Sequence, residues 1–283
     1  MLNGCAYILT VDVGNTFIRF GLFAEDSAAA QERPLATCEI TTPSSITADE
    51  ARMRLAQVMG ALAADAVMPG ALVPAAAVLS CVVPALERPW KAALSRTCTG
   101  RVLTVGPGLK TGMPVHYDDP AEIGPDRIAD AVAARAVYGS PCIVIDLGTT
   151  TNIEVIDAHG TFVGGVIAPG LALGARSLSA AAARLPQVEP SAPTHVIGRN
   201  TREAMRSGVV LGEVARIDGM LDMVLAEMRS TKAAGEDGVP IVITGDDAEA
   251  LAALVGHSLT VDDALTLRGL AELYRINQKP RRV

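Results

Sequence analysis

One short motif occurs twice in this chain of 283 residues. Each copy is an apolar run that ends in aspartate, followed by an apolar residue, a glycine and two polar residues. The two aspartates, Asp12 and Asp146, are 134 positions apart (146 − 12), which is nearly half the chain. An apolar run, a glycine turn and a returning run of alternating character predict a β-hairpin. The repeat therefore predicts two similar halves, each built around one hairpin.

The turns of both hairpins carry groups suited to a phosphate-bearing ligand. Gly14 is followed by Asn15 and Thr16, and Gly148 is followed by three threonines. Main-chain N–H groups and hydroxyls in such turns bind anions, and an aspartate beside them can hold a hydrated cation. Together they indicate a site for the phosphate tail of a metal–nucleotide complex. The alternative for either copy alone is an ordinary hairpin with a glycine turn, but the second copy favours the functional interpretation.

The order of apolar runs predicts an α/β fold with two domains. Residues 7–105 read as three strands followed by alternating helices and strands, and the same plan returns from residue 143 with an additional helix. We expect the domains to cover residues 1–115 and 116–283. A long helix is predicted over 202–229, and its apolar stripe is wide enough to need cover on more than one side. The stripe consists of Met205, Val209, Leu211, Val214, Ile217, Leu221, Val224, Leu225 and Met228.

Composition and charge argue against several classes of partner. The net charge of −7 gives nucleic-acid binding no electrostatic support. No apolar stretch reaches the roughly 20 residues that a membrane span needs. The cysteines are scattered without C-x-x-C spacing, which is typical of reduced thiols. They are Cys5, Cys38, Cys81, Cys98 and Cys142. We therefore expect a cytoplasmic protein that binds neither nucleic acid nor membranes.

The connector between the halves contains a second candidate for chemistry. Gly124 and Pro125 stop an incoming strand, and Asp126 and Arg127 then open a helix. An aspartate at a helix start is often only a cap, since it interacts favourably with the helix dipole. The functional alternative is that Asp126 accepts a proton from a substrate hydroxyl and that Arg127 binds a substrate carboxylate with two hydrogen bonds.

Taken in order, these motifs resemble those of type III pantothenate kinases, a family in the acetate kinase, sugar kinase, Hsp70 and actin fold group. The resemblance covers nearly the whole chain. Its blocks are the two phosphate loops at 12–16 and 146–151, the substrate block from Tyr117 to Arg127, and shorter matches at 80–84, 164–170, 185–186, 200–208 and 244–245.

The resemblance implies a fold, an activity and a set of site residues. The fold would be two tandem ribonuclease H-like (actin-like ATPase) domains, each a mixed five-stranded sheet with helices. The activity would be phosphorylation of pantothenate by ATP, the first step toward coenzyme A, in a homodimer. ATP would contact Asp12, Val13, Gly14, Asn15, Thr16, Phe17, Ile18, Arg19 and Thr149. Pantothenate would contact Tyr117, Gly124, Pro125, Asp126, Arg127 and Thr201, with Asp126 as the proton acceptor. Asp12 would lie near Mg²⁺, and Asp146 would bind a monovalent cation, K⁺ or NH₄⁺.

The sequence departs from the family pattern at several positions close to the expected nucleotide. The first loop continues with Phe17 and Ile18 in place of Asn and Thr, Asn152 replaces a threonine of the second loop, and Asp246 replaces a glycine. We therefore expect weak binding of ATP. Two alternatives stay open at this point. One is a catalytically weak relative that acts as a binding or regulatory protein, and the other is a different kinase or phosphatase of the same fold group.

Overall fold

The computed structural model describes residues 6–25, 31–68, 72–235 and 238–278, so Cys5 lies outside the described residues. The chain forms two compact units. The first comprises Met1–Val137 together with Ala264–Val283, and the second comprises Tyr138–Asp263. This division differs from the expected boundary at residues 115 and 116. Residues 116–137 and the last helix belong to the first unit, in which the last helix packs against the sheet and meets residue Ala129 of the 116–137 segment.

The first unit is built on a mixed five-stranded sheet with the strand order β3-β2-β1-β4-β5. The first three strands are antiparallel, and β4 and β5 continue the sheet in parallel with β1. The strands are β1 (Tyr7–Val13), β2 (Phe17–Ala24), β3 (Ala36–Thr41), β4 (Ala76–Cys81) and β5 (Val102–Thr104). The helices are α1 (Ala48–Asp65), α2 (Pro84–Thr97), the short 3₁₀ helix η1 (Pro120–Glu122), α3 (Pro125–Tyr138) and α8 (Leu265–Ile276).

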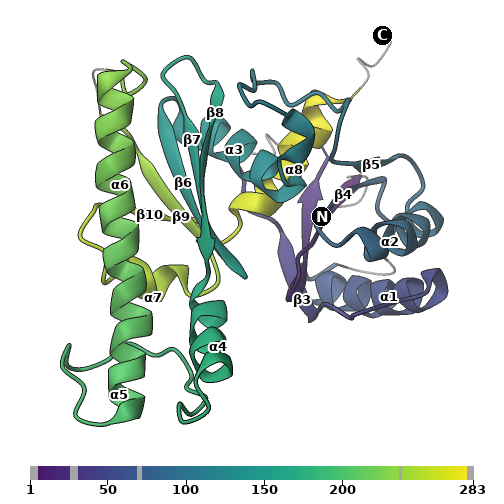
Figure 1. The fold of residues 1–283 in the computed structure, drawn as a ribbon. Helices are drawn as coiled ribbons and strands as arrows, with labels where there is room; N and C mark the ends of the chain where they lie inside the picture. Colours follow the sequence, from purple (N-terminus) through teal and green to yellow (C-terminus); the bar gives the residue numbers. More distant parts are fainter. Residues whose placement is uncertain (1–5, 26–30, 69–71, 236–237, 279–283) are drawn as a thin grey trace. The chain divides into compact units, whose positions relative to one another are not determined.

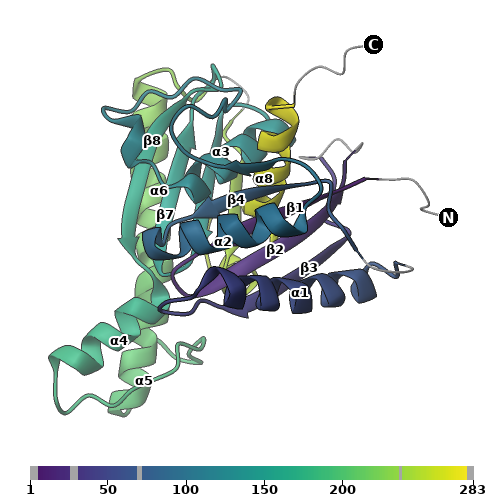
Figure 2. The same ribbon diagram turned by 90° about the vertical axis from the view of Figure 1, so that its right-hand side faces the viewer.

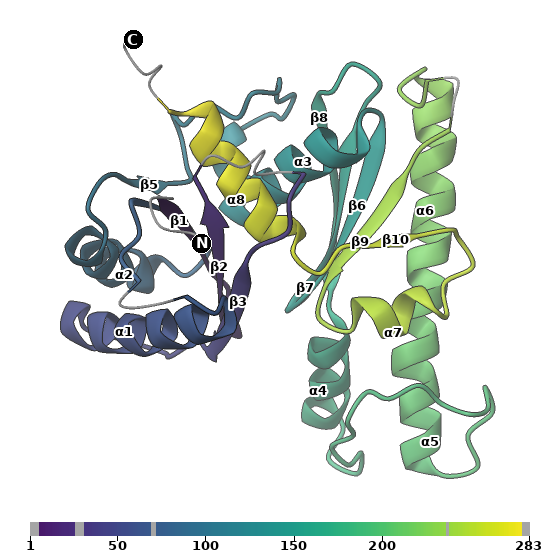
Figure 3. The same cartoon turned by 180° about the vertical axis from the view of Figure 1, so that it is seen from behind.

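Both faces of this sheet are covered by helices. Helices α1 and α2 lie together on one face (Figure 2). Alternate residues of β1, β2 and β4 pack with them in one apolar core, which includes Trp90 and Phe20 with ring centroids 5.6 Å apart. On the other face α8 contacts β1, β2 and β4 (Figure 3). Helix α3 reaches α8 so closely that a Cβ at Gly269 would lie 1.9 Å from the carbonyl oxygen of Ala129, so only glycine fits there.

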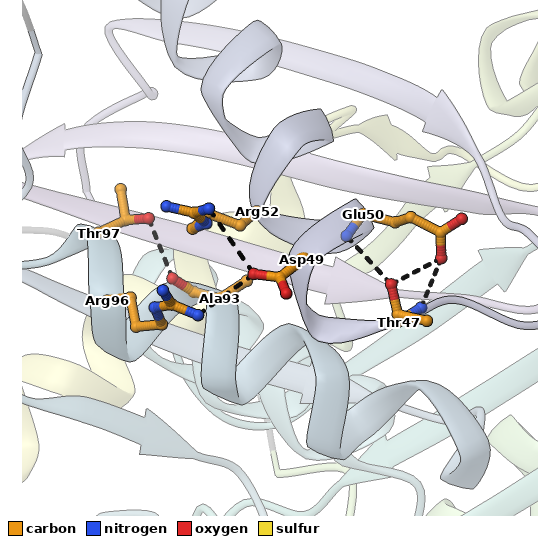
Figure 4. Close-up of polar contacts among 7 residues, drawn as sticks. All are labelled: Thr47, Asp49, Glu50, Arg52, Ala93, Arg96 and Thr97. Carbon is orange, nitrogen blue, oxygen red and sulfur yellow. Dashed lines mark hydrogen bonds and ion pairs between the residues drawn. The ribbon is translucent and has the colours of Figure 1, made fainter.

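Polar contacts fix the start of α1 and join it to α2 (Figure 4). The Thr47 hydroxyl accepts a hydrogen bond from the Glu50 N–H, and the Glu50 carboxylate accepts one from the Thr47 N–H, which is a capping box. Asp49 forms exposed ion pairs with Arg52 and Arg96, the latter on α2. Such exposed pairs contribute at most about 1 kcal/mol each, so the two helices are held together mainly by their apolar contact.

The second unit repeats the plan, with a mixed sheet in the order β10-β9-β6-β7-β8. Its strands are β6 (Cys142–Leu147), β7 (Thr150–Ile156), β8 (Phe162–Pro169), β9 (Ile241–Gly245) and β10 (Thr260–Val261). Its helical segments are α4 (Leu171–Ala181), α5 (Thr201–Arg206), the π-helical segment η2 (Ser207–Leu211), α6 (Gly212–Ser230) and α7 (Ala248–Ala252). The expectation of two mixed five-stranded sheets with helices is confirmed.

The long helix of the second unit is partly covered by the second sheet. Segments α5, η2 and α6 form one continuous helical run, of which α6 lies along the sheet and α5 extends beyond it toward α4 (Figure 1). Four residues of the predicted stripe are buried against that sheet, namely Val214, Ile217, Leu221 and Met228. Four others remain half-buried in the single chain, namely Val209, Leu211, Val224 and Leu225, so the expectation that the stripe needs cover on more than one side stays a prediction.

Other apolar residues of this unit are exposed. Helix α4 has the sequence LALGARSLSAA, yet only its Ala175 is buried. Leu173 and Leu178 of α4, Ile167 of β8 and Met223 of α6 are all exposed. Separately, within the described part of the chain, no helix is long and apolar enough to cross a membrane.

Candidate active site

The first phosphate loop is the tight turn between β1 and β2. The Gly14 N–H donates to the Phe17 carbonyl at 3.0 Å, and Thr42 holds the turn from β3 through its hydroxyl, which donates to the Gly14 carbonyl at 2.8 Å. Asn15 and Thr16 at the tip are exposed. The turn is thus fixed by neighbouring main chain while its tip faces solvent, as an anion-binding loop requires.

The side chains of this loop do not all face a ligand. Val13 and Ile18 are buried in the apolar core, so any contact of these two residues with ATP would have to come from the main chain. Arg19 forms an ion pair with Glu39 on β3 at 2.9 Å, and its guanidinium carbon lies 5.9 Å from the Phe17 ring centroid. Arg19 therefore already has an anionic neighbour before any phosphate is bound.

Asp12 is a buried carboxylate near the end of β1, opposite Ser80 of β4. Burial, and secondly the charge of Asp126, raise its pKa to about 6, against a lowering by the neighbouring Ser80 hydroxyl and by the charge of Arg19. Its Oδ1 is buried and has no hydrogen-bond partner among the described residues. An oxygen left in this condition fits a ligand of Mg²⁺ or of its water shell.

A metal ion at Asp12 could take its other ligands from a nucleotide and from water. No group of three or more His, Cys, Asp or Glu side chains suited to a metal ion occurs in the described ranges. Mg²⁺ commonly binds through one or two carboxylates together with substrate phosphates and water. The single carboxylate of Asp12 is consistent with that mode.

The raised pKa of Asp12 predicts a measurable effect on stability. Its folded-state pKa of about 6 lies above the unfolded value near 3.8, so protonated Asp12 stabilises the fold below about pH 4 and this contribution is lost as the pH rises through 6. Asp12→Asn should therefore raise the free energy of unfolding of the ligand-free protein at pH 8 by on the order of 2–3 kcal/mol, and the melting temperature should rise with it. At pH 4 both quantities should hardly change.

Thermal melts from pH 4 to 8 measure this difference, with Asp65→Asn as the control because Asp65 is exposed. If Asp12→Asn raises the melting temperature by the same amount at every pH, the charge of Asp12 does not destabilise the fold.

Asp126 is held at the start of α3 by its local backbone. Its Oδ1 accepts a hydrogen bond from the Arg127 N–H at 2.8 Å. A Cβ at residue 124 would lie 2.3 Å from that same oxygen, so Gly124 leaves the space in which the carboxylate sits. Burial raises the pKa of Asp126, while the hydrogen bond from Arg127 and its charge oppose the rise. A fixed, desolvated carboxylate with a raised pKa has the properties of a general base.

A cavity of about 390 Å³ lies within the first unit and reaches the first turn of α3. Pro125 and Ile128, on either side of Asp126 in the sequence, both line it. Most of the remaining wall is apolar and comes from the ends of β4 and β5, the 106–115 loop and η1, with Cys81, Val105, Met113 and Ile123 among its residues. A cavity of this size suits a small organic molecule.

The other residues of the predicted substrate block lie in the same unit. Arg127 is buried and Tyr117 is half-buried. The Asp119 carboxylate accepts a hydrogen bond from the Ala121 N–H and so caps η1 between them. The structure thus brings Asp12, Arg19 and the 117–127 block into one compact unit.

The second phosphate loop, Gly148 and Thr149 between β6 and β7, belongs to the second unit. The Gly148 N–H donates to the Thr150 carbonyl at 2.9 Å, and the Gly170 N–H donates to the Thr149 carbonyl at 3.1 Å. A Cβ at Gly170 would lie 2.2 Å from the Gly148 carbonyl oxygen, so the chain after β8 closes tightly on the loop.

Asp146 and Thr201 also lie in the second unit. Asp146 stands near the end of β6, opposite Asn152 in the strand register, and the Asn152 amide lies 3.5 Å from its carboxylate. Thr201 is the exposed first residue of α5, whose N-cap is Asn200. The predicted site residues therefore divide between the two units.

Sequence reasoning missed three features of these sites. They are the pairing of Ser80, part of the match at 80–84, with Asp12, the apolar cavity wall from 105–113, and the buried Glu213, which bonds to Thr151. Ser80 and the 105–113 loop follow or end strands parallel to β1, and the carboxyl ends of parallel strands are the usual place of a ligand site. That signal was available in the sequence, whereas the partner of Glu213 was not.

Comparison with known proteins agrees with this geometry. The family model for type III pantothenate kinase matches residues 8–223. The chain is 37% identical to type III pantothenate kinase from Koribacter versatilis over 276 residues, covering 96% of each chain. It is 39% identical to the protein of that name from Nocardia farcinica, covering 97% of this chain and 99% of the other.

Two solved structures share the fold at low identity. A Baf family transcriptional activator from Campylobacter jejuni has a TM-score of 0.54 at 18% identity, covering 95% of this chain and 98% of the other. The ROK hexokinase from Thermus thermophilus has a TM-score of 0.51 at 13% identity, covering 96% and 100%. At such identities they support the fold alone, two tandem ribonuclease H-like domains.

Proposed function

Because the chain belongs to the type III pantothenate kinase family, we propose that it transfers the γ-phosphoryl group of ATP to the primary hydroxyl of pantothenate, the first step toward coenzyme A. The observation that carries the proposal is in the first unit. Asp126 is fixed and desolvated, its chain neighbours Pro125 and Ile128 line a cavity of about 390 Å³, and it is close enough to Asp12 for the two charges to interact. The proposed base Asp126, the cavity for the acceptor and the metal-binding carboxylate of Asp12 thus belong to the same unit.

The residues of the first unit have separate roles in this proposal. Asp126 orients the hydroxyl and accepts its proton. Tyr117 and Arg127 hold pantothenate, with the guanidinium on its carboxylate. Gly124 and Pro125 shape the start of α3 around Asp126. The cavity wall receives the branched apolar part of the substrate.

The nucleotide is bound by the phosphate loops. Residues 12–19 and Thr149 contact ATP, and Asp12 holds Mg²⁺, which supplies charge neutralisation at the transferring phosphoryl group. Asp146 binds a monovalent cation, K⁺ or NH₄⁺, a role supported by its carboxylate near the end of β6 beside the second loop. Catalysis then consists mainly of positioning and of electrostatic stabilisation.

We further propose a cytoplasmic homodimer that binds neither nucleic acid nor membranes. Helix α4 supports the dimer, since an apolar helix with a single buried residue needs a partner. Free thiols at Cys38, Cys81 and Cys98 support a reducing compartment. The net charge of −7 argues against nucleic acid.

The proposal is tested with purified protein, pantothenate, ATP, Mg²⁺ and K⁺ in an assay coupled to ADP formation, with the phosphorylated product identified by mass spectrometry. Turnover that needs pantothenate supports the kinase, and replacing K⁺ by Na⁺ tests the monovalent cation. Pantothenate binding without turnover would instead indicate a binding or regulatory protein. Neither binding nor turnover would indicate another member of the fold group.

We expect the Michaelis constant for ATP to be ~1 mM or higher, the upper end of the usual range. The reason is that Glu39 competes with phosphate for Arg19, and that Phe17 and Asp246 replace smaller or polar groups. Glu39→Gln should lower this constant by up to about fivefold, since an exposed ion pair contributes at most about 1 kcal/mol.

Initial rates at varied ATP measure both effects, with Glu32→Gln as the control because Glu32 is an exposed carboxylate of the same unit. A constant in the low micromolar range for the parent protein would show that these departures do not weaken nucleotide binding.

A further inference from the structure

A buried polar network connects the long helix to the second phosphate loop, all within the second unit. Glu213 lies in the first turn of α6 and is only 4% exposed. Its Oε1 accepts a hydrogen bond from the Thr151 hydroxyl of β7 at 2.6 Å. Its Oε2 pairs with Arg216 one turn later, and Arg216 Nη2 donates to the Pro169 carbonyl of β8 at 2.6 Å.

The two strand positions held by this network flank the loop. Thr151 follows the loop on β7, and Pro169 ends β8 directly opposite Thr150 in the register. The next residue, Gly170, donates to the Thr149 carbonyl and has no room for a side chain. Glu213 therefore holds one side of the loop directly and the other side through Arg216.

The network buries charged groups in otherwise apolar surroundings, which costs free energy of folding. The face of the sheet turned toward α6 is otherwise apolar, with Leu147, Ile153 and Val155 packed against Val214 and Ile217. A carboxylate buried at such a place is expensive unless it is fully paired, and an apolar contact would often stabilise the fold as well or better. Pairing of this kind fixes geometry rather than adding stability.

The helix is also irregular just before Glu213. The π-helical segment η2 ends at Leu211 and shifts the register of the helix relative to α5. Such segments are frequent at functional sites. The same helical run carries Thr201 at the start of α5 and Glu213 in the first turn of α6, where it bonds to Thr151 next to the second loop.

We propose that Glu213 is a positioning residue for nucleotide binding, which sets the second phosphate loop through Thr151 and Arg216. It touches neither substrate nor phosphate and acts by fixing where the Thr149 hydroxyl and the loop N–H groups lie. This inference rests on the proposed function insofar as it takes the second loop as a contact of ATP.

Two variants test it. Glu213→Gln keeps the shape but removes the charge, so that the amide oxygen makes only a neutral-acceptor hydrogen bond with Arg216, while its N–H₂ group faces Thr151, whose hydroxyl must then accept instead of donate. Thr151→Val removes only the hydroxyl at constant volume. Asp218→Asn is the matched control, since Asp218 is also a hydrogen-bonded carboxylate of α6 but pairs with Gly256 and His257, away from the loop.

Three quantities are measured: the Michaelis constants for ATP and pantothenate, the affinity for a fluorescent ATP analogue with Mg²⁺, and the melting temperature. Glu213→Gln should weaken both measures of nucleotide binding on the order of tenfold, as is usual when an outer partner of a binding group is lost. Thr151→Val should act in the same direction, and Asp218→Asn should leave both within twofold. The constant for pantothenate should stay within twofold throughout.

The outcomes separate this inference from the proposed function. If both variants melt earlier but bind the analogue as the parent does, Glu213 is merely structural and the inference is wrong, whether or not the parent is a kinase. If the Michaelis constants for ATP and for pantothenate rise together, the network does not act specifically on the second phosphate loop, and the inference is again wrong. If the parent binds the analogue without turnover and Glu213→Gln weakens that binding, the inference holds and the kinase proposal fails. A parent that binds no analogue would overturn the inference.

Discussion

Asp126→Asn should lower kcat by roughly 10²–10⁴ while pantothenate binding stays within a few-fold of the parent. The amide can still accept the hydrogen bond that the Arg127 N–H makes to Oδ1, so the side chain keeps its place in the space left by Gly124. It cannot take up the proton of the substrate hydroxyl. Initial rates at saturating ATP and calorimetric titration with pantothenate measure the two effects separately.

The control for this experiment is Asp119→Asn, seven residues earlier in the same block. Asp119 is also a carboxylate that accepts a main-chain hydrogen bond, at the N-cap of η1. Its substitution should leave kcat within a few-fold of the parent. If Asp126→Asn behaves in the same way, Asp126 only caps α3 and the proposed mechanism is wrong.

The repeated hairpins were predictable because their determinants are local. A run of apolar residues, a glycine turn and a returning run specify a hairpin whatever surrounds it, and Gly14 and Gly148 both occupy the predicted turns. The two five-stranded sheets follow from the same alternation repeated along each half. The family resemblance added the order of the blocks and through it the fold type.

The division into units was not predictable in the same way, because it depends on long-range packing. Helix α8 covers one face of the first sheet although it is the last helix in the sequence. Its contact with α3 depends on the close approach of Gly269 to the Ala129 carbonyl. Nothing local to either helix shows that they meet. A boundary placed in the Gly- and Pro-rich connector therefore assigned 116–137 and 264–276 to the other half.

The contacts within the candidate site also depend on long-range packing, which local sequence patterns do not predict. Asp12 and Asp126 were found from local patterns, but their interaction and the pKa of about 6 that burial gives Asp12 depend on how the unit folds. Likewise Glu213 reads in the sequence as one more charge on a long helix. Only its contact with Thr151, 62 residues away in sequence, shows a role.

A second substitution experiment with a large expected effect tests which subunit of the homodimer contributes each residue of the active site. If the homodimer shares its sites, each would use Asp126 of one subunit and Thr201 of the other. Thr201 is exposed in the single chain, at the start of the helical run that follows the uncovered α4. We expect Asp126→Asn and Thr201→Ala each to be nearly inactive alone, and co-expression of the two variants to restore about a quarter of the parent activity.

The expected quarter follows from random pairing. About half of the dimers would be mixed, and each mixed dimer would hold one intact site, made of the unchanged Asp126 of one chain and the unchanged Thr201 of the other. If both residues came from one chain, every site in a mixed dimer would carry one substitution and activity would stay at the level of the separate variants. The Thr201→Ala control comes first, because an active Thr201→Ala protein would already remove Thr201 from the site. Differently tagged chains, purified through both tags, isolate the mixed dimer, for which the shared-site model predicts half of the parent activity and the single-chain model predicts none.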